Sequence, residues 1–341
     1  MSERNIHLVL GAGLLGKAIV KELLKQGKKV RVFDIRPYDH PNTDNVQGDL
    51  TVAADLDKAF QNVEVVYHNA SVIDWNPNGS PLLEKVNVQG TQNVIDACVR
   101  NGVPKLVYTS SMDVVYGGKP IKNGDESLPY PEHHLDPYSE SKTKAEKLVL
   151  KANGRKDGEV ELTTCSLRVT GIYGEHDTVK YPIIMQTYRD GKMRRMGSGK
   201  SLFSNLYAGN AAHAHILAAE SLTPNSVAAG NSYFLTDHEP QNFFDIIEEM
   251  GDRLGYKMPK GKVPYWLIIT IAVIGETIAK WTKAKKPPLL TIYGAKATCL
   301  DLYFNHDKIT KDLGYQPIYT YEEGLNNTIN WLREAGWANK K

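Results

Sequence analysis

The sequence predicts an α/β protein built on a doubly wound parallel sheet, with a smaller and irregular C-terminal part. Strand-like and helix-like segments alternate through the first half of the chain, the pattern of a parallel sheet flanked by helices. The strand segments are continuous apolar runs, as expected when helices cover both faces of a sheet. After about residue 170, short helices alternate with stretches rich in Gly, Asn, Pro and Tyr, which indicates a change of architecture.

The predicted elements follow one another in strand–helix order. Short apolar runs predict strands at 6–10, 29–33, 63–68, 105–109 and 161–169, with a further strand before Asp49. Apolar residues at helical spacing predict helices at 14–25, 53–60, about 82–100, about 138–152, 211–220 and 243–254.

Composition excludes several classes of protein. Of 341 residues, 41% are hydrophobic and 23% charged, which fits a globular protein and excludes a disordered one. The net charge of +2 gives no reason to expect a nucleic-acid partner. Three scattered cysteines without a CxxC pair predict neither a disulfide framework nor a metal site. The N-terminus runs directly into an apolar strand, so we expect no secretory signal.

A glycine-rich turn follows the first predicted strand and opens the first helix. Its sequence, GAGLLG at 11–16, is the GxGxxG pattern of dinucleotide-binding proteins in the strand–helix context that gives it meaning. Glycines allow a pyrophosphate to approach the backbone, and the helix N-terminus stabilises its charge. The residues expected at the pyrophosphate are Gly11, Gly13, Leu14, Leu15 and Gly16. This turn makes the predicted fold Rossmann-type.

The chain length predicts about two domains. We expect residues 1–170, joined by about 205–236, to form the nucleotide-binding Rossmann domain. Residues 171–204 and 237–341 are expected to form the substrate-binding domain, which includes an apolar segment at about 265–281.

An acidic residue at the end of the second strand selects the cofactor. Asp34 lies 18 positions after Gly16, where a carboxylate accepts hydrogen bonds from the adenosine ribose and repels the 2′-phosphate of NADP. NAD is therefore the predicted cofactor. Arg36 lies two residues further on and partly offsets that repulsion, so NADP stays the less favoured alternative.

Two further strand ends are expected near the cofactor. Asp49 and Leu50 follow the third strand, where they can reach the adenine; the alternative for Asp49 is a helix cap or loop acid. Asn69, Ala70 and Ser71 follow the strand at 63–68, where small residues suit close approach to the cofactor. A plain strand terminus is the alternative there.

A tyrosine and a lysine four residues apart form the core of a catalytic site. Tyr138 and Lys142 share one face of the predicted helix. A phenol is a poor base near neutral pH, but a neighbouring ammonium and the positive ring of oxidised nicotinamide favour its phenolate. We therefore expect Tyr138 to accept a proton from a substrate hydroxyl, and Lys142 also to bind the nicotinamide ribose.

Two polar residues complete the predicted catalytic set. Ser111, with Ser110 as second choice, ends a strand at the edge where open α/β sheets hold ligands, and its hydroxyl can hold the substrate oxygen. The alternative is a serine that only turns the chain. Asn87 lies in the long predicted helix, where it either orders the active site or is a buried structural asparagine.

Six segments carry a family resemblance: VNVQGTQNV (86–94), LVYTSS (106–111), LRVTGIYGEHD (167–177), YAGNAAHAH (207–215), LGYQP (313–317) and EEGLNNTINW (322–331). Together they resemble the extended short-chain dehydrogenase/reductase superfamily and, within it, the 3β-hydroxysteroid dehydrogenase/isomerase family. The likeness covers nearly the whole chain and is strongest to the decarboxylating sterol branch. The chain departs from the family at four positions: Leu10, Leu14, Asp113 and Thr170.

The resemblance implies an NAD-dependent oxidation. The substrate would be a sterol, steroid or related polycyclic terpenoid, whose 3β-hydroxyl becomes a ketone; a carboxylate at C4 would then leave as CO₂. The resemblance also implies a homodimer at the cytosolic face of the endoplasmic reticulum membrane, with a cytoplasmic location as the alternative. Two other functions stay open: a nucleotide-sugar epimerase or dehydratase, and a non-catalytic NAD-binding sensor or scaffold.

The apolar segment at 265–281 is too short to cross a bilayer comfortably, since a span needs about 20 apolar residues. Lysines bracket it at 257, 260 and 262 and again at 280, 283, 285 and 286. This pattern predicts peripheral docking on an anionic leaflet. The alternative is a buried helix or a dimer contact that lines the pocket.

Overall fold

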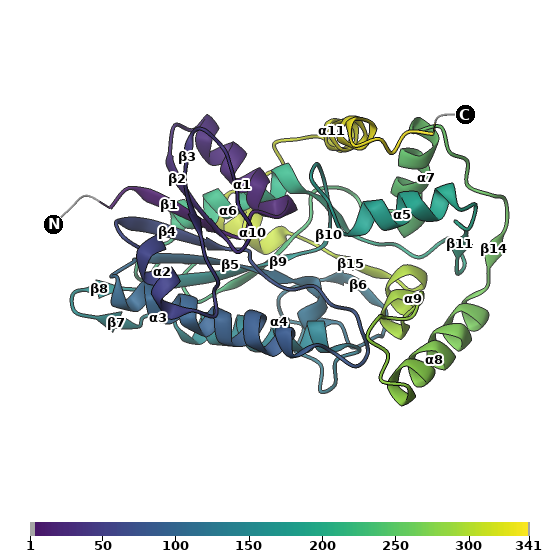
Figure 1. Cartoon of the computed structure of the whole chain (residues 1–341), viewed down its shortest axis with the longest axis horizontal. Helices are drawn as coiled ribbons and strands as arrows, with labels where there is room; N and C mark the ends of the chain where they lie inside the picture. The colour runs from purple at the N-terminus through teal and green to yellow at the C-terminus, as the bar shows by residue number, and fades with distance from the viewer. Residues whose placement is uncertain (1–3, 340–341) are drawn as a thin grey trace.

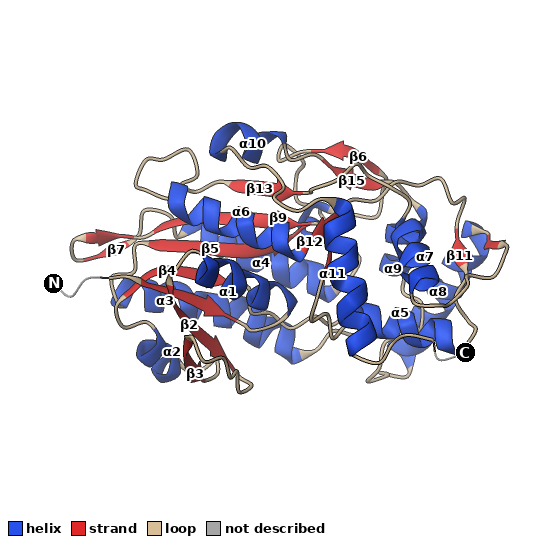
Figure 2. Ribbon diagram, turned by 90° about the horizontal axis from the view of Figure 1, so that it is seen from above, coloured by secondary structure: helices blue, strands red, loops and turns tan. Residues whose placement is uncertain are grey.

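The structure, a computed structural model, describes residues 4–339 and confirms the predicted fold class. Seven parallel strands form one sheet in the order β13-β9-β5-β4-β1-β2-β3 (Figure 2). Their bounds are β1 Ile6–Leu10, β2 Lys29–Asp34, β3 Thr43–Gln47, β4 Val63–His68, β5 Lys105–Ser111, β9 Thr163–Val169 and β13 Ser232–Leu235. Because all pairs are parallel, the carboxyl ends of these strands lie along one edge of the sheet.

Helices cover both faces of this sheet (Figure 1). They are α1 Leu14–Lys25, α2 Ala53–Ala59, α3 Thr91–Arg100, α4 Pro137–Lys151 and α6 Ala208–Ser221. One buried apolar cluster joins the sheet to α1 and α6, and a second joins it to α2, α3 and α4. Burial on both faces explains why the strands read as unbroken apolar runs.

Several predicted boundaries were wrong. β2 and β5 each extend beyond the predicted end, so that Asp34 and Ser111 are the last residues of strands. The strand predicted at 161–169 begins at Thr163, because β8 Val160–Glu161 pairs antiparallel with β7 Lys156–Asp157. The helix predicted at 211–220 begins earlier, at Ala208.

The long helix predicted at 82–100 is two different helices. Its first part is a π-helix, η1 Leu83–Gly90, which runs directly into the α-helix α3. The wider π turn cannot be read from apolar spacing, because both forms place residues on a continuous helical surface.

The C-terminal part consists of six helices and several short strands within the described residues. Its helices are α5 Lys180–Arg189, α7 Phe243–Arg253, α8 Tyr265–Trp281, α9 Ile292–Cys299, α10 Asp307–Leu313 and α11 Tyr321–Glu334. Its short strands are β10 Gly171–Tyr173, β11 Arg195–Met196, β12 Asn205–Tyr207, β14 Lys262–Val263 and β15 Leu302–Phe304, and the 3-10 helix η2 Met112–Val115 and β6 Ile121–Gly124 precede them in the chain. β15 pairs with β6, which ties residues near 300 to the loop after β5.

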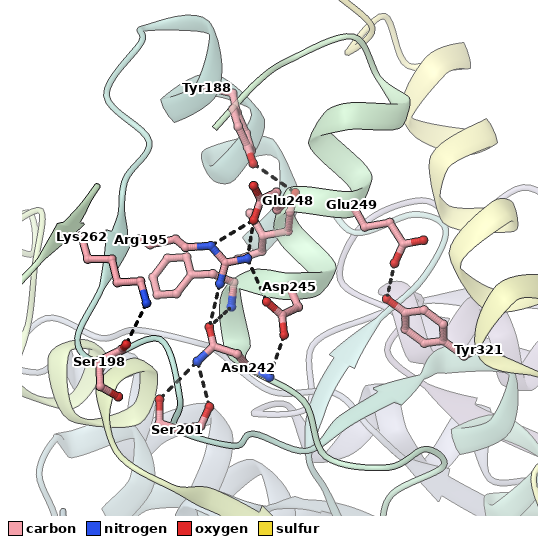
Figure 3. Close-up of polar contacts among 12 residues, drawn as sticks. Tyr188, Arg195, Ser198, Ser201, Asn242, Asp245, Glu248, Glu249, Lys262 and Tyr321 are labelled. Carbon is pink, nitrogen blue, oxygen red and sulfur yellow. Dashed lines mark hydrogen bonds and ion pairs between the residues drawn. The ribbon is translucent and has the colours of Figure 1, made fainter. Parts of the chain in front are cut away.

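A polar cluster fixes the start of α7 (Figure 3). Asn242 caps the helix and also donates to the Ser201 carbonyl at 2.8 Å. The Arg195 guanidinium donates to Asp245 at 2.8 Å and pairs with Glu248. These contacts bind the 195–201 loop to α7, beside an apolar cluster in which Met196 packs against residues of α7.

Helix α8 occupies the predicted bounds and has two unlike faces. Ile268 and Ala272 pack on α9, and the Glu276 carboxylate accepts from the Ile292 N–H at 2.6 Å. The opposite face carries large exposed apolar side chains, with Trp266 67% and Trp281 85% exposed. The C-terminal end of α8 is fastened to the loop before η1, since Asn78 donates to the Ala279 carbonyl at 3.0 Å. Within residues 4–339, no helix is both long and apolar enough to cross a membrane.

Candidate active site

The glycine loop after β1 is packed so tightly that side chains are excluded at two positions. Gly11 has φ +92°, and a Cβ there would lie 2.7 Å from Ala70 Cα. A Cβ on Gly16 would lie 1.9 Å from the Gly11 carbonyl oxygen. Gly13 differs, because a Cβ there would meet nothing within 4 Å. Gly13 therefore faces open space at the start of α1.

Asp34 is held beside this loop. Its carboxylate accepts from the Ala12 N–H at 2.7 Å and from the Arg36 N–H at 2.8 Å. The Arg36 guanidinium lies 3.5 Å from Asp34 and is largely exposed. The structure thus places the acidic residue at the carboxyl end of β2, next to the loop, while Arg36 reaches toward solvent.

Asn69 and Ala70 form the other wall of the loop. Asn69 Nδ2 donates to the Gly11 carbonyl at 2.6 Å. Its Oδ1 is buried and has no hydrogen-bond partner within the described part of the chain. Ser71 lies next to them, partly buried.

Asp49 and Leu50 have local roles. The Asp49 carboxylate accepts from the Thr51 N–H at 2.8 Å, which shapes the turn before α2. Leu50 is buried, and its carbonyl accepts from Asn93 at 3.0 Å. These contacts shape the turn locally, and the expected reach of Asp49 and Leu50 to the adenine stays a prediction.

The loop and its walls fit a dinucleotide. No described side chain caps the first turn of α1, so its N–H donors are left to a ligand. Gly13 leaves room for a phosphate, and the positive end of the helix dipole favours an anion. The orphaned Asn69 oxygen supplies an acceptor at the same edge. Residues 11–16, Asp34 and Asn69 are therefore the groups that can hold the cofactor.

Tyr138 lies in the first turn of α4. Asp136 caps this helix, since its carboxylate accepts from the Ser139 N–H at 2.9 Å and the Ser139 hydroxyl at 2.7 Å, and Pro137 is suited to the first helical position. Burial raises the pKa of Tyr138, and the carboxylates of Asp113 and Asp136 raise it further. The phenol is therefore neutral unless positive charge comes close to it.

Lys142 lies one turn further along the same buried face of α4. Its ammonium donates to the Thr109 carbonyl of β5 at 2.6 Å and lies 4.4 Å from the centre of the Tyr108 ring. Burial lowers the pKa of Lys142 to about 7, while the charges of Glu146 and Asp113 oppose that shift.

Ser111 ends β5 and is bonded to a residue that the sequence marked only as a departure from the family. Its hydroxyl donates to the Asp113 carboxylate at 2.7 Å. The other carboxylate oxygen of Asp113 accepts from the Tyr293 hydroxyl of α9 at 2.5 Å. Asp113 is buried, and burial raises its pKa while both hydroxyls act to lower it.

Asn87 connects η1 to its surroundings on two sides. Its amide bonds the backbone of Val72 in both directions, accepting from the N–H at 2.7 Å and donating to the carbonyl at 2.9 Å. It also donates to the Ser141 hydroxyl at 3.0 Å, and that hydroxyl donates to the Tyr138 carbonyl. The chain after β4 and the catalytic turn of α4 are thus joined through one side chain.

Sequence reasoning missed a buried ion pair beneath these residues. Glu146 of α4 is fully buried and pairs with Arg168 of β9, with Arg168 Nη2 donating at 2.8 Å. The Ser166 and Tyr130 hydroxyls donate to the same carboxylate, each at 2.8 Å. The sequence marks this ion pair only by the charged Arg168 inside an apolar strand. Its partner Glu146 could not be identified, because it lies 22 positions away in the chain.

Parallel strand ends gather the predicted residues along one edge of the sheet. Ser111, Tyr138 and Lys142 lie around the end of β5, and Asn87 bonds the chain after β4 and Ser141 of α4. The glycine loop, Asp34 and Asn69 surround the ends of β1, β2 and β4. Among residues 4–339, Ser111, Tyr138 and Lys142 line neither of two cavities of about 610 and 320 Å³, the first of which Leu14 lines.

Comparison with solved structures identifies the architecture. The UDP-glucose 4-epimerase of Thermus thermophilus, in complex with NAD, has a TM-score of 0.72 at 22% identity and covers 97% of this chain and 99% of its own. A short-chain dehydrogenase/reductase superfamily protein from Agrobacterium tumefaciens, with bound NAD, has a TM-score of 0.70 at 21% identity and covers 97% of this chain and 98% of its own. The fold is that of the extended short-chain dehydrogenases.

Comparison of sequences narrows the class. The model of the 3-beta hydroxysteroid dehydrogenase/isomerase family matches residues 8–265. Sterol-4-alpha-carboxylate 3-dehydrogenase (decarboxylating) of Bos taurus is 35% identical and covers 94% of this chain and 90% of its own. The 3-beta-hydroxysteroid dehydrogenase of Mycolicibacterium neoaurum is also 35% identical and covers 95% of this chain and 90% of its own. The chain belongs to the 3-beta hydroxysteroid dehydrogenase/isomerase family of oxidoreductases.

Proposed function

We propose that this protein oxidises the 3β-hydroxyl of a sterol, steroid or related polycyclic terpenoid to the 3-ketone, with NAD as oxidant. The observation that carries the proposal is the placement of Ser111, Tyr138 and Lys142 around the end of β5, beside a glycine loop that fits a dinucleotide. The 35% identity to enzymes named as sterol and steroid dehydrogenases supports the substrate class.

The roles of the side chains follow from their chemistry. Ser111 holds the substrate oxygen, and Tyr138 takes the hydroxyl proton. Because burial and two carboxylates raise the pKa of Tyr138, this transfer depends on the charge of Lys142 and on the positive charge of the oxidised cofactor. Bound NAD⁺ would accept the hydride that leaves C3. Asn87 holds the first turn of α4 against the chain after β4, through its bonds to Ser141 and Val72.

The preference for NAD over NADP rests on Asp34. A carboxylate fixed by two backbone N–H groups at the end of β2 suits ribose hydroxyls and repels a phosphate. Arg36 is exposed and offsets this repulsion only in part.

A carboxylate at C4 of the substrate would have a simple fate. Oxidation at C3 converts such a substrate into a β-keto acid. The bond from C4 to the carboxylate carbon then breaks readily, because its electrons are delocalised into the new carbonyl as an enolate. CO₂ leaves, and the enolate takes up a proton.

The exposed face of α8 supports a peripheral location on a membrane. Large apolar side chains with exposed tryptophans at both ends, bracketed by lysines, suit shallow insertion into an anionic leaflet such as the cytosolic face of the endoplasmic reticulum. We also expect a homodimer, from the family resemblance. The division into a cofactor domain (1–170 with about 205–236) and a substrate domain is part of this proposal.

Co-sedimentation with vesicles tests the location. The protein should sediment with vesicles that contain anionic lipid, and Trp266→Ser with Trp281→Ser should release it. Ile35→Ser is the control, since Ile35 is an exposed apolar residue far from α8 in the chain. Equal sedimentation of all three forms would contradict the docking face.

A substrate panel tests the reaction. Purified protein is mixed with NAD and a set of 3β-hydroxysteroids, and NADH absorbance is followed. Oxidation of at least one sterol supports the proposal. Turnover of a UDP-sugar alone would assign the chain to the epimerases that its fold resembles, and NAD binding without turnover of any substrate would identify a sensor.

A further inference from the structure

The Asp113 carboxylate lies one hydrogen bond from the reacting centre. Ser111 donates to one of its oxygens at 2.7 Å, and the function proposed above requires the substrate oxygen to contact the same serine. Asp113 also acts electrostatically on Tyr138 and Lys142. A negative charge is therefore built into the wall where C3 and its neighbours must lie.

The hydrogen bonds from two hydroxyls favour the charged form of this carboxylate, and burial acts in the opposite direction. The Ser111 hydroxyl and the Tyr293 hydroxyl each have a single hydrogen, and both point to Asp113. The Tyr293 contact, at 2.5 Å, is within the range of a charge-assisted O–H···O⁻ bond. Tyr293 comes from α9, 180 positions away, so the substrate side of the molecule supplies the second donor.

A carboxylate on the substrate would meet this charge at close range. In a sterol 4α-carboxylic acid the charged group is bonded to the carbon next to C3, so it cannot be far from the oxygen that Ser111 holds. Two like charges in a buried, poorly hydrated site repel strongly. Lys142 attracts the same group, but its ammonium is already bonded to the Thr109 carbonyl.

Resting on the function proposed above, we propose that Asp113 determines specificity by disfavouring substrates with an anionic group next to the reacting hydroxyl. The protein then acts on neutral 3β-hydroxysterols or related alcohols and leaves their 4α-carboxylates to other members of the family. The oxidation gives a ketone and NADH, without loss of CO₂.

The test compares one sterol with its 4α-carboxylic acid. We expect wild-type kcat/KM with NAD to favour the neutral sterol by at least about tenfold, which corresponds to about 1.4 kcal/mol. Asp113→Asn should shift that ratio at least about tenfold toward the acid, because the repulsion disappears and the attraction of Lys142 stays. Dissociation constants of the two sterols, measured by calorimetry without cofactor, should change in the same direction.

Two further variants separate charge from structure. Tyr293→Phe removes a hydrogen bond and keeps the carboxylate, so the ratio should change by less than about threefold. Asp125→Asn removes an exposed carboxylate from a nearby loop in the sequence and should leave the ratio unchanged.

The outcomes separate failure of the proposed role of Asp113 from failure of the proposed dehydrogenase function. Equal or better turnover of the acid by the wild-type protein would overturn the role of Asp113 and leave the dehydrogenase function standing, and this result needs no variant to fold. An unchanged ratio in folded Asp113→Asn would overturn it too. Turnover of neither sterol would overturn the proposed function, and this inference with it.

Discussion

The buried ion pair between Glu146 and Arg168 should be the strongest single polar contribution to the stability of the catalytic helix. Glu146 is fully buried and Arg168 is 4% exposed, so neither charge has water to replace its partner. Arg168→Met removes the donors at 2.8, 3.1 and 3.2 Å and leaves Glu146 with uncharged donors such as the Ser166 and Tyr130 hydroxyls. An uncompensated buried charge costs about 3–5 kcal/mol, and we expect that loss in the free energy of unfolding.

Urea denaturation of the wild type and four variants measures this cost and its origin. Glu146→Gln alone should also destabilise by about 3–5 kcal/mol, because it strands the guanidinium. The double variant should lose about 1–3 kcal/mol less than the sum of the two single losses, since no charge is left unpaired. Arg195→Met is the control, because that arginine is only partly buried in the ion pairs of Figure 3 and should cost about 1 kcal/mol or less.

Two results would refute the reasoning. Loss of less than about 1 kcal/mol in Arg168→Met would mean that water or a rotated side chain replaces the guanidinium. Strict additivity in the double variant would mean that the two residues contribute through packing and not through their charges.

Four further outcomes are expected. Tyr138→Phe should bind NAD as the wild type does and lose at least about 100-fold in kcat; full activity would remove the assigned base. Gly13→Ala should keep the melting temperature and weaken NAD binding measured by calorimetry. Gly11→Ala should lower the melting temperature, because its Cβ meets Ala70. The opposite pattern would contradict the proposed binding of the cofactor at the glycine loop. Asp34→Ala should raise the ratio of NADP to NAD turnover by at least about tenfold, and an unchanged ratio would exclude its role. Burial lowers the pKa of Lys142 to about 7 from 10.5, so between these pH values the unfolded chain binds one proton more than the folded protein. The stability of the wild type should therefore rise with pH by up to about 1.4 kcal/mol per pH unit in this range, relative to Lys142→Met. Parallel stability curves would contradict this.

The parts of the fold that the sequence predicted are those dominated by local periodicity. The strands β1, β4 and β5 and the helices α1 and α8 follow from apolar runs whose burial depends on the sheet and not on distant details. Short elements such as β6 and β15 could not be predicted, because they pair with segments far away in the chain, β6 with β15 some 180 positions further on.

In the candidate site, too, residues marked by their local sequence could be predicted and residues marked only by distant contacts could not. Ser111, Tyr138 and Lys142 could be chosen from spacing and from their places at strand and helix ends. Tyr293 could not, because nothing near it in sequence marks it as a partner of Asp113. Asp49 could be placed after a strand from the sequence, whereas the hydrogen bond from Thr51 to its carboxylate could not, and its expected reach to the adenine stays a prediction.

The π-helical winding of η1 makes the contacts of Asn87 at the candidate active site sensitive to the number of residues in this helix. Removing a single amino acid between 83 and 86 without a change of helix type would rotate the later side chains of η1 around the helix axis relative to the residues before it. Asn87 would then release both Val72 and Ser141, although no residue of the catalytic set had been replaced.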